Sequence, residues 1–290
     1  SEDAEITMEA NPGTVSLEQM KLCRKAGINR ISLGLQSTVQ QELDMLGRIH
    51  TYEEFLHSYH WVREAGFDNI NVDLMFAIPG QTCESWKHNL ETVAELSPEH
   101  ISAYSLIIEE GTPFARKKLI LPTEDEEYQM YEDTAEILRK YGFHQYEISN
   151  YARDGFECRH NKGYWQRIEY LGVGLGAASL FQGKRFSNTS DMKVYLSDST
   201  DPEKIREDVT TLSGSNEMEE FMFLGLRMTE GISEIQFERN FGCRIEDIYG
   251  SVLTKYKDMD LLEHTGEFWR FTRKGIHVSN PVLADFLLDE

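Results

Sequence analysis

Three polar side chains lie in or directly after apolar, strand-like runs of the sequence: Glu9, Gln36 and Asp73. An acidic side chain in an apolar strand costs free energy unless it is paired or meets a ligand. In a (β/α) barrel the reactive residues lie where the strands end, so side chains of consecutive strands share one site. Two carboxylates and an amide suit a ligand that carries an ammonium group and ribose hydroxyls. The alternative is structural, since the same residue types cap turns and bind helix termini.

Arg48 follows the second of these runs, within Leu46-Gly47-Arg48. A guanidinium group at this place could pair with a ligand carboxylate through two parallel hydrogen bonds. The position is equally typical of a surface arginine, and the residue alone does not decide between the two.

A polar, aromatic segment at residues 150–165, predicted to be a loop, holds a second candidate group: His160, Asn161, Tyr164 and Trp165. Histidine can ligate haem iron, and tyrosine and tryptophan rings can stack on a porphyrin. Histidines in loops are often only solvated or hydrogen-bonded. The pattern by itself leaves both interpretations open.

The elements that must position the first group alternate between strand and helix. Apolar, β-rich runs occur near residues 4–9, 29–35, 69–76, 100–108 and 144–148. Segments with helical periodicity lie between them, and several of these end at a glycine. This order predicts an α/β fold in which βα units build a parallel sheet. Four or five units are too few for a closed eight-stranded barrel, so we expect an open barrel or a barrel whose first strands are absent.

After about residue 150 the alternation stops. We predict a partial (β/α) barrel over residues 1–150, an extension over 151–212 and a small, mainly helical, winged-helix-like domain over 213–290. Within the extension we predict a Gly-rich strand over 170–178 and a linker over 197–210. The last part is predicted to hold helices near 215–226, 233–241, 245–257 and 280–288, with short strands at 261–262 and 269–271.

Composition excludes several classes of function. The net charge of −21 at pH 7, from 50 acidic and 29 basic residues, disfavours binding to nucleic acid. No apolar run approaches the roughly 20 residues that span a bilayer, so we expect no transmembrane segment. The cysteines are far apart in the sequence, which is not typical of disulfide frameworks or zinc sites: Cys23, Cys83, Cys158 and Cys243. Reduced thiols in the cytoplasm fit this pattern best.

Taken together, the motifs resemble those of oxygen-independent coproporphyrinogen III oxidases and their radical SAM relatives, nearest the haem-chaperone branch of the HemW type. The matching segments follow the family's order over nearly the whole chain: residues 8–13, 31–37, 46–48, 71–82, 105–113, 146–152, 159–165 and 272–280. The resemblance implies a radical SAM barrel in which four residues contact S-adenosylmethionine (SAM), namely Glu9, Gln36, Arg48 and Asp73. Arg48 would take the methionine carboxylate, and the other three would hold the ammonium group and the ribose.

One departure from the family pattern is large. The CxxxCxxC motif that ligates a [4Fe–4S] cluster in this family is absent, and the four cysteines cannot replace it at their spacing. We therefore expect the cluster-binding segment and the first strands to lie upstream of Ser1.

In the haem-chaperone branch an HNxxYW motif, here residues 160–165, is linked to haem binding. The resemblance thus implies a cytoplasmic protein that binds SAM and haem and delivers haem to respiratory proteins. The alternative that it implies is an oxygen-independent coproporphyrinogen III oxidase, a dehydrogenase that decarboxylates two propionates in porphyrin biosynthesis.

Overall fold

The structure, a computed structural model, describes residues 3–112 and 114–288, so Pro113 of the matched segment 105–113 lies outside the described residues. The chain forms two compact units that divide between Cys158 and Arg159. Each unit has a hydrophobic cluster of its own. The predicted three-part division at residues 150 and 212 remains a prediction.

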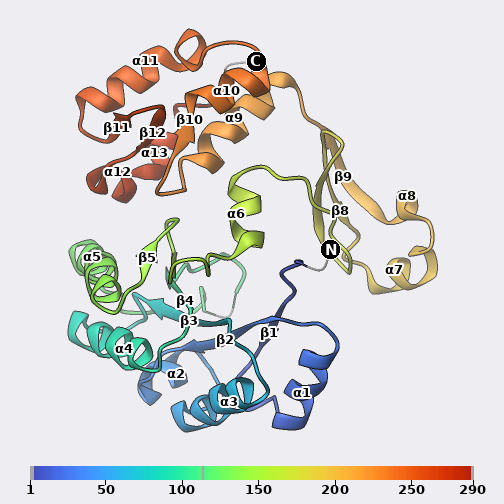
Figure 1. The fold of residues 1–290 in the computed structure, drawn as a ribbon, viewed down its shortest axis with the longest axis vertical. Coiled ribbons are helices and arrows are strands. Elements are labelled where there is room, and N and C mark those ends of the chain that lie inside the picture. Colours follow the sequence, from blue (N-terminus) through green and yellow to red (C-terminus); the bar gives the residue numbers. More distant parts are fainter. Residues whose placement is uncertain (1–2, 113, 289–290) are drawn as a thin grey trace. The chain divides into compact units, whose positions relative to one another are not determined.

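The first unit is built on a six-stranded sheet in the order β1-β2-β3-β4-β6-β5 (Figure 1). Its strands are β1 (Thr7–Ala10), β2 (Arg30–Gln36), β3 (Ile70–Phe76), β4 (His100–Ser105), β5 (His144–Gln145) and β6 (Asn150–Ala152). Strands β1 to β4 are parallel, as the alternation of strands and helices predicts. β6 pairs antiparallel with both β4 and β5, so the fifth predicted run is shorter than expected and lies outside the parallel set. Among the described residues the sheet is open, which confirms the α/β fold with a partial barrel.

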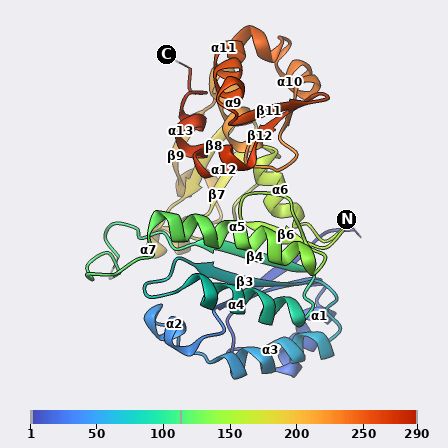
Figure 2. The same ribbon diagram turned by 90° about the vertical axis from the view of Figure 1, so that its left-hand side faces the viewer.

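Five helices connect these strands: α1 (Leu17–Lys25), α2 (Gln40–Met45), α3 (Tyr52–Glu64), α4 (Cys83–Glu95) and α5 (Glu124–Lys140). Four of them begin after a hydroxyl side chain that accepts a hydrogen bond from a first-turn backbone N–H: Ser16, Thr51, Thr82 and Thr123. Such caps satisfy donors that the start of a helix leaves unpaired. Helices α1, α3 and α4 lie on one side of the sheet (Figure 2).

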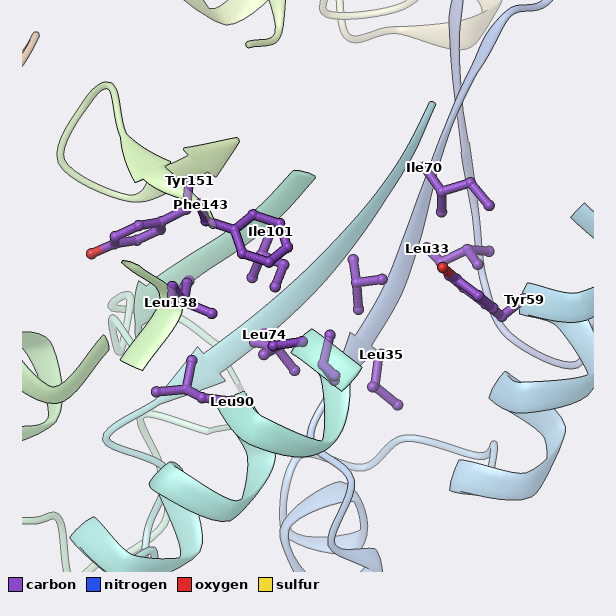
Figure 3. Close-up of a cluster of buried hydrophobic side chains, with 14 of the residues drawn as sticks. Leu33, Leu35, Tyr59, Ile70, Leu74, Leu90, Ile101, Leu138, Phe143 and Tyr151 are labelled. Carbon is purple, nitrogen blue, oxygen red and sulfur yellow. The ribbon is translucent and has the colours of Figure 1, made fainter. Parts of the chain in front are cut away.

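Alternate residues of the parallel strands face these helices. Leu33, Leu74 and Ile101 are fully buried in the cluster that forms there (Figure 3). Leu90 of α4 and Leu138 of α5 belong to the same cluster. Because neighbouring residues of a strand point to opposite faces, the residues between these leave a second, polar face on the sheet.

The second unit begins with a helix and a three-stranded antiparallel sheet. Its first elements are α6 (Arg159–Trp165), β7 (Ala178–Phe181), β8 (Lys184–Asn188), α7 (Met192–Asp198), α8 (Pro202–Ile205) and β9 (Arg206–Thr211). Two predictions are wrong here. Residues 159–165 form a helix rather than a loop, and residues 197–210 are mostly helix and strand rather than a linker.

The Gly-rich run is a further correction, because residues 171–177 do not form a strand. Gly174 and Gly176 have positive φ angles of 117° and 67°, which interrupt an extended chain. A Cβ at residue 172 would collide with the carbonyl oxygen of Ala178. The glycines therefore serve a tight loop that packs against the start of β7.

The rest of the second unit combines helices with a small sheet of order β10-β12-β11. Its elements are α9 (Gly214–Gly225), β10 (Ile232–Ser233), α10 (Glu234–Phe241), α11 (Ile245–Asp258), β11 (Leu262–Thr265), β12 (Phe268–Phe271), α12 (Arg273–His277) and α13 (Ser279–Ala284). The last helix, predicted to end at residue 288, ends four residues earlier, at Ala284. Helix α12 was not predicted. Across the described parts of both units, no helix is long and apolar enough to cross a membrane.

Candidate functional site

A cavity of about 590 Å³ lies on the polar face of the first unit's sheet. The residues that line it come from β1 to β4 and from the segments after β1 and α2: Glu9, Ala10, Asn11, Ser32, Gly34, Gln36, Arg48, Asp73 and Tyr104. The structure thus brings all four residues predicted for the SAM site to one cavity. The volume lies within the roughly 300–1,000 Å³ that is typical of small-molecule sites.

The two-residue period of the strands explains this convergence. In β3, Val72 and Leu74 are buried against the helices, so Asp73 between them faces the cavity. In β4, Ala103 is buried in the same cluster, and the next residue, Tyr104, faces the cavity. The neighbouring parallel strands therefore all direct polar side chains into the same cavity.

Asp73 is held by two hydrogen bonds inside the sheet. Its Oδ2 accepts from the Ser32 hydroxyl at 2.9 Å, and its Oδ1 accepts from Nδ2 of Asn71 at 2.8 Å. Burial raises the pKa of Asp73, and these hydrogen bonds lower it again, while the nearby charge of Glu9 raises it. The net shift is upward. Two acidic side chains at one cavity favour a ligand with positive charge.

Gln36 ends β2 with a φ angle of 72°, in the left-handed region. A non-glycine residue in this region costs about 1–3 kcal/mol, and such residues cluster at ligand sites. The Oε1 of Gln36 accepts a hydrogen bond from the hydroxyl of Tyr104 at 3.2 Å. Burial and the charge of Asp73 raise the pKa of Tyr104 to about 12, so the phenol stays neutral. Tyr104 was not among the residues that the sequence suggested, although the alternation in β4 could have indicated it.

Arg48 lines the cavity from the turn that ends α2. Gly47 has a φ of 71°, and the backbone N–H of Arg48 donates to the carbonyl of Leu43 at 2.9 Å. This αL turn fixes where the Arg48 side chain starts.

A buried carboxylate in α2 anchors that turn to the rest of the unit. Glu42 is only 6% exposed. Its carboxylate accepts hydrogen bonds from Ser37 at 2.6 Å, from Gln81 at 2.9 Å and from Asn89 at 3.1 Å, and Ser85 is a further partner. Glu42 therefore ties α2 to α4 and to the loop before it. No local feature of the sequence indicates this role.

The second candidate group lies on α6 in the second unit. The rings of His160 and Tyr164, one helical turn apart, meet edge to face with 4.5 Å between their centroids. Tyr170 stands edge-on to Tyr164 at 4.6 Å. His160 and Tyr164 are exposed, and Asn161 is half-buried. An exposed histidine beside two tyrosine rings fits a ligand that is flat, apolar and centred on a metal.

Trp165 differs from the other motif residues. Its ring lies 5.0 Å from the guanidinium carbon of Arg227, a cation–π contact. Together with Phe221, Gly225 and other residues it lines a cavity of about 60 Å³ within the second unit. We attribute to Trp165 a part in anchoring α6 to α9.

The residues described do not provide a metal centre. Among residues 3–112 and 114–288, no group of three or more His, Cys, Asp or Glu side chains is placed to hold a metal ion. Cys23, Cys83, Cys158 and Cys243, all among the described residues, form no disulfide with one another. The described residues therefore do not fit an iron–sulfur cluster.

The chain is similar to known proteins over almost its whole length. Residues 1–93 match the Radical SAM superfamily, and residues 212–278 match the HemN C-terminal domain. Heme chaperone HemW of Lactococcus lactis subsp. lactis is 40% identical over 290 residues, which cover 99% of this chain and 76% of that protein. Heme chaperone HemW of Bacillus subtilis is 36% identical over 294 residues, covering 99% and 77%.

A solved structure has the same fold. Coproporphyrinogen III oxidase (HemN) of Escherichia coli, a radical SAM enzyme, superposes with a TM-score of 0.85 at 21% identity, over 99% of this chain and 70% of that chain. The identity and coverage of the HemW relatives establish the closer relationship. The chain belongs to the HemW family of the radical SAM superfamily.

Proposed function

We propose that this chain acts in a radical SAM haem chaperone that binds SAM in the cavity of the first unit and carries haem as its cargo. The observation that carries the proposal is the convergence of Glu9, Gln36, Arg48 and Asp73 on one cavity. Three relatives at 40%, 36% and 32% identity are named heme chaperone HemW, and these names support the haem part.

The chemistry of the cavity suits SAM. Arg48 provides a guanidinium group for the methionine carboxylate. A guanidinium group can bind a carboxylate through two parallel hydrogen bonds, which makes such pairs strong. The acidic side chains Glu9 and Asp73, with the amide of Gln36, would share the ammonium group and the ribose hydroxyls. SAM supplies an adenosyl group next to a cationic sulfonium, and the two carboxylates attract that charge. The radical SAM family implies a [4Fe–4S] cluster as well. The described residues offer it no ligands, so their proposed role is to bind and orient SAM.

Removal of either charged group tests the SAM site. In the full-length protein, Arg48→Ala and Asp73→Ala should each weaken SAM binding about 10- to 100-fold, because each leaves a charged group of the ligand without its partner. Isothermal titration with SAM measures this. Arg239→Ala, at an exposed position of α10, is the matched control and should bind like the wild type. Wild-type affinity in both cavity variants would refute the site.

Haem binding is assigned to α6. We propose that His160 ligates the iron and that Tyr164 stacks beside the macrocycle, with haem passed on to respiratory proteins in the cytoplasm. Haem titration of the full-length protein should show a Soret band that shifts and an affinity that falls in His160→Ala. His88→Ala, at an exposed position of α4, should leave both unchanged. An identical Soret band and affinity in His160→Ala would reject this assignment.

The oxidase function implied by the sequence is the alternative. Both functions would use the same SAM cavity, so SAM binding does not separate them. An anaerobic assay of the full-length protein with coproporphyrinogen III does: release of two CO2 per substrate would displace the chaperone proposal.

A further inference from the structure

A row of buried polar side chains crosses the first unit's sheet beside the cavity. The register of the parallel strands pairs Ser32 with Asn71, and Asn71 with His100. Asn71 is 2% exposed and His100 is fully buried. At one end of the row, Nδ2 of Asn71 donates to Asp73, which lines the cavity. Polar groups buried this deeply are hydrogen-bonded in native proteins. The donor and the acceptor of each bond follow from the partners of Asn71.

The partners of Asn71 fix the tautomer of His100. Nδ2 of Asn71 donates to the Oδ1 of Asp73 at 2.8 Å and to the hydroxyl of Ser32 at 2.7 Å. Oδ1 of Asn71 is therefore an acceptor, and it lies 2.6 Å from Nδ1 of His100. Nδ1 must carry the proton of the neutral ring, which leaves Nε2 as an acceptor.

Tyr146 completes the row on the other side of the ring. Its hydroxyl lies 2.9 Å from Nε2 of His100 and so must donate to it. The same oxygen accepts the backbone N–H of Cys158 at 3.3 Å. Four donors in sequence, from Cys158 through Tyr146, His100 and Asn71, thus all point toward Asp73. Donors aligned in this way polarise one another and strengthen the last bond.

His100 stays neutral in this setting. Burial lowers its pKa well below the ordinary value, and the positive charge of Arg30 acts in the same direction. The direction of the row is therefore constant across the neutral pH range.

We propose that Asn71, His100 and Tyr146 are positioning residues for SAM: they orient the carboxylate of Asp73, keep it ionised, and connect it to the backbone that leads into α6. The inference rests on the proposed function, because it requires Asp73 to contact SAM. A merely structural role would make these residues matter for stability alone. With a positioning role, their substitution also changes the affinity for SAM and the pH dependence of that affinity.

The expected pH effect follows from the bonds to Asp73. Burial raises the pKa of Asp73, and the hydrogen bonds from Asn71, Ser32 and Ser102 oppose that rise. Loss of the oriented Asn71 bond should raise the pKa further, so SAM affinity should begin to fall at a higher pH during acidification. The other groups that face the carboxylate, Glu9 on β1, Tyr104 on β4 and Arg48 after α2, are the same in every variant and cannot create this difference.

The test is SAM titration of the full-length protein over a series of pH values. His100→Phe removes both hydrogen bonds of the ring and should weaken SAM binding about tenfold, with the acid limb displaced to higher pH. His100→Asn keeps an amide donor where Nδ1 stood and should restore most of the affinity. Tyr146→Phe removes one donor and should weaken binding about threefold. Tyr59→Phe is the matched control, since Tyr59 and Tyr146 are both 3% exposed and Tyr59 donates to Leu96 instead.

The outcomes separate this inference from the proposed function. If Asp73→Asn weakens SAM binding while His100→Phe and Tyr146→Phe match the wild type in affinity and pH profile, the positioning role is wrong and the SAM site stands. If Asp73→Asn has no effect, the positioning role is wrong, because it requires Asp73 to contact SAM, and Arg48→Ala then decides whether the SAM site stands. Circular dichroism identifies a variant that does not fold. If His100→Phe does not fold, the comparison of SAM affinity and pH profile between Tyr146→Phe and Tyr59→Phe decides whether the positioning role holds.

Discussion

At the scale of single residues, the sequence indicates those polar groups that stand in an apolar context. Glu9, Gln36 and Asp73 interrupt or end apolar runs, and this local contrast is visible without a structure. Glu42 and His100 are buried, yet most of their hydrogen-bond partners lie far away in sequence. For example, Glu42 of α2 accepts a hydrogen bond from Asn89 of α4. Only the fold brings such pairs together, so their roles could not be predicted.

Glu42 should be important for stability as well as for the placement of Arg48. Glu42→Ala leaves the side chains of Ser37, Gln81 and Asn89 buried without their acceptor, which should lower the free energy of unfolding by about 2–3 kcal/mol. Urea unfolding of the full-length protein should show a lower midpoint and an unchanged m-value. Glu91→Ala, at an exposed position of the same helix α4, should change the midpoint little. A midpoint for Glu42→Ala equal to the control would contradict this role.

At the scale of elements, the accuracy of the predictions follows the strength of the apolar pattern. Strands β1 to β4 and helices α1, α3, α4 and α5 carry regular apolar faces and capping residues, and they form as predicted. Strand β9 is mostly exposed and its sequence does not alternate between apolar and polar residues. For this reason the sequence predicts a linker there. Helix α6 contains a glycine and no buried residue, and it reads as a loop. Weakly amphipathic elements are held by their neighbours rather than by their own sequence.

One carboxylate in the second unit links α9 to β8 and to the segment that follows α6. Glu220 of α9 accepts from Arg167, which follows α6, at 2.9 Å, and from Arg185 of β8 at 2.6 Å. Burial raises the pKa of Glu220, but the hydrogen bonds and charges of the two arginines outweigh it and the pKa is lowered. Glu220→Gln should therefore destabilise the second unit by about 2 kcal/mol at pH 7.

The pH dependence of that effect has a definite sign. A carboxylate whose pKa is lower in the folded state contributes stability that is fully present above its unfolded pKa and is lost as the pH falls through the folded pKa. The difference in stability between wild type and Glu220→Gln should therefore shrink on acidification below the ordinary value of 4.5. Denaturation at pH 7 and at lower pH, with Glu238→Gln of α10 as control, measures it. A difference that grows toward low pH would contradict the assignment.

At the scale of the whole molecule, the two halves of the proposed function lie in different units. The cavity proposed to bind SAM belongs to the first unit, and the HNxxYW motif lies on α6 of the second. The chain spans about three quarters of the length of its HemW relatives, 76% and 77%. The order of motifs along the sequence was sufficient to indicate the family, because that order covers both units. The sequence could not indicate which motif residues are exposed, since Trp165 and Tyr164 are both aromatic and differ only in their packing.

Side chains from neighbouring parallel strands are proposed to bind SAM together in one cavity. A crystal structure of the full-length protein with SAM tests this proposal most directly. We predict the methionine carboxylate within hydrogen-bond distance of Arg48, and the ammonium group or ribose within that distance of Asp73. SAM bound at another place, with Arg48 and Asp73 both out of contact with it, would show that this cavity is not the SAM site.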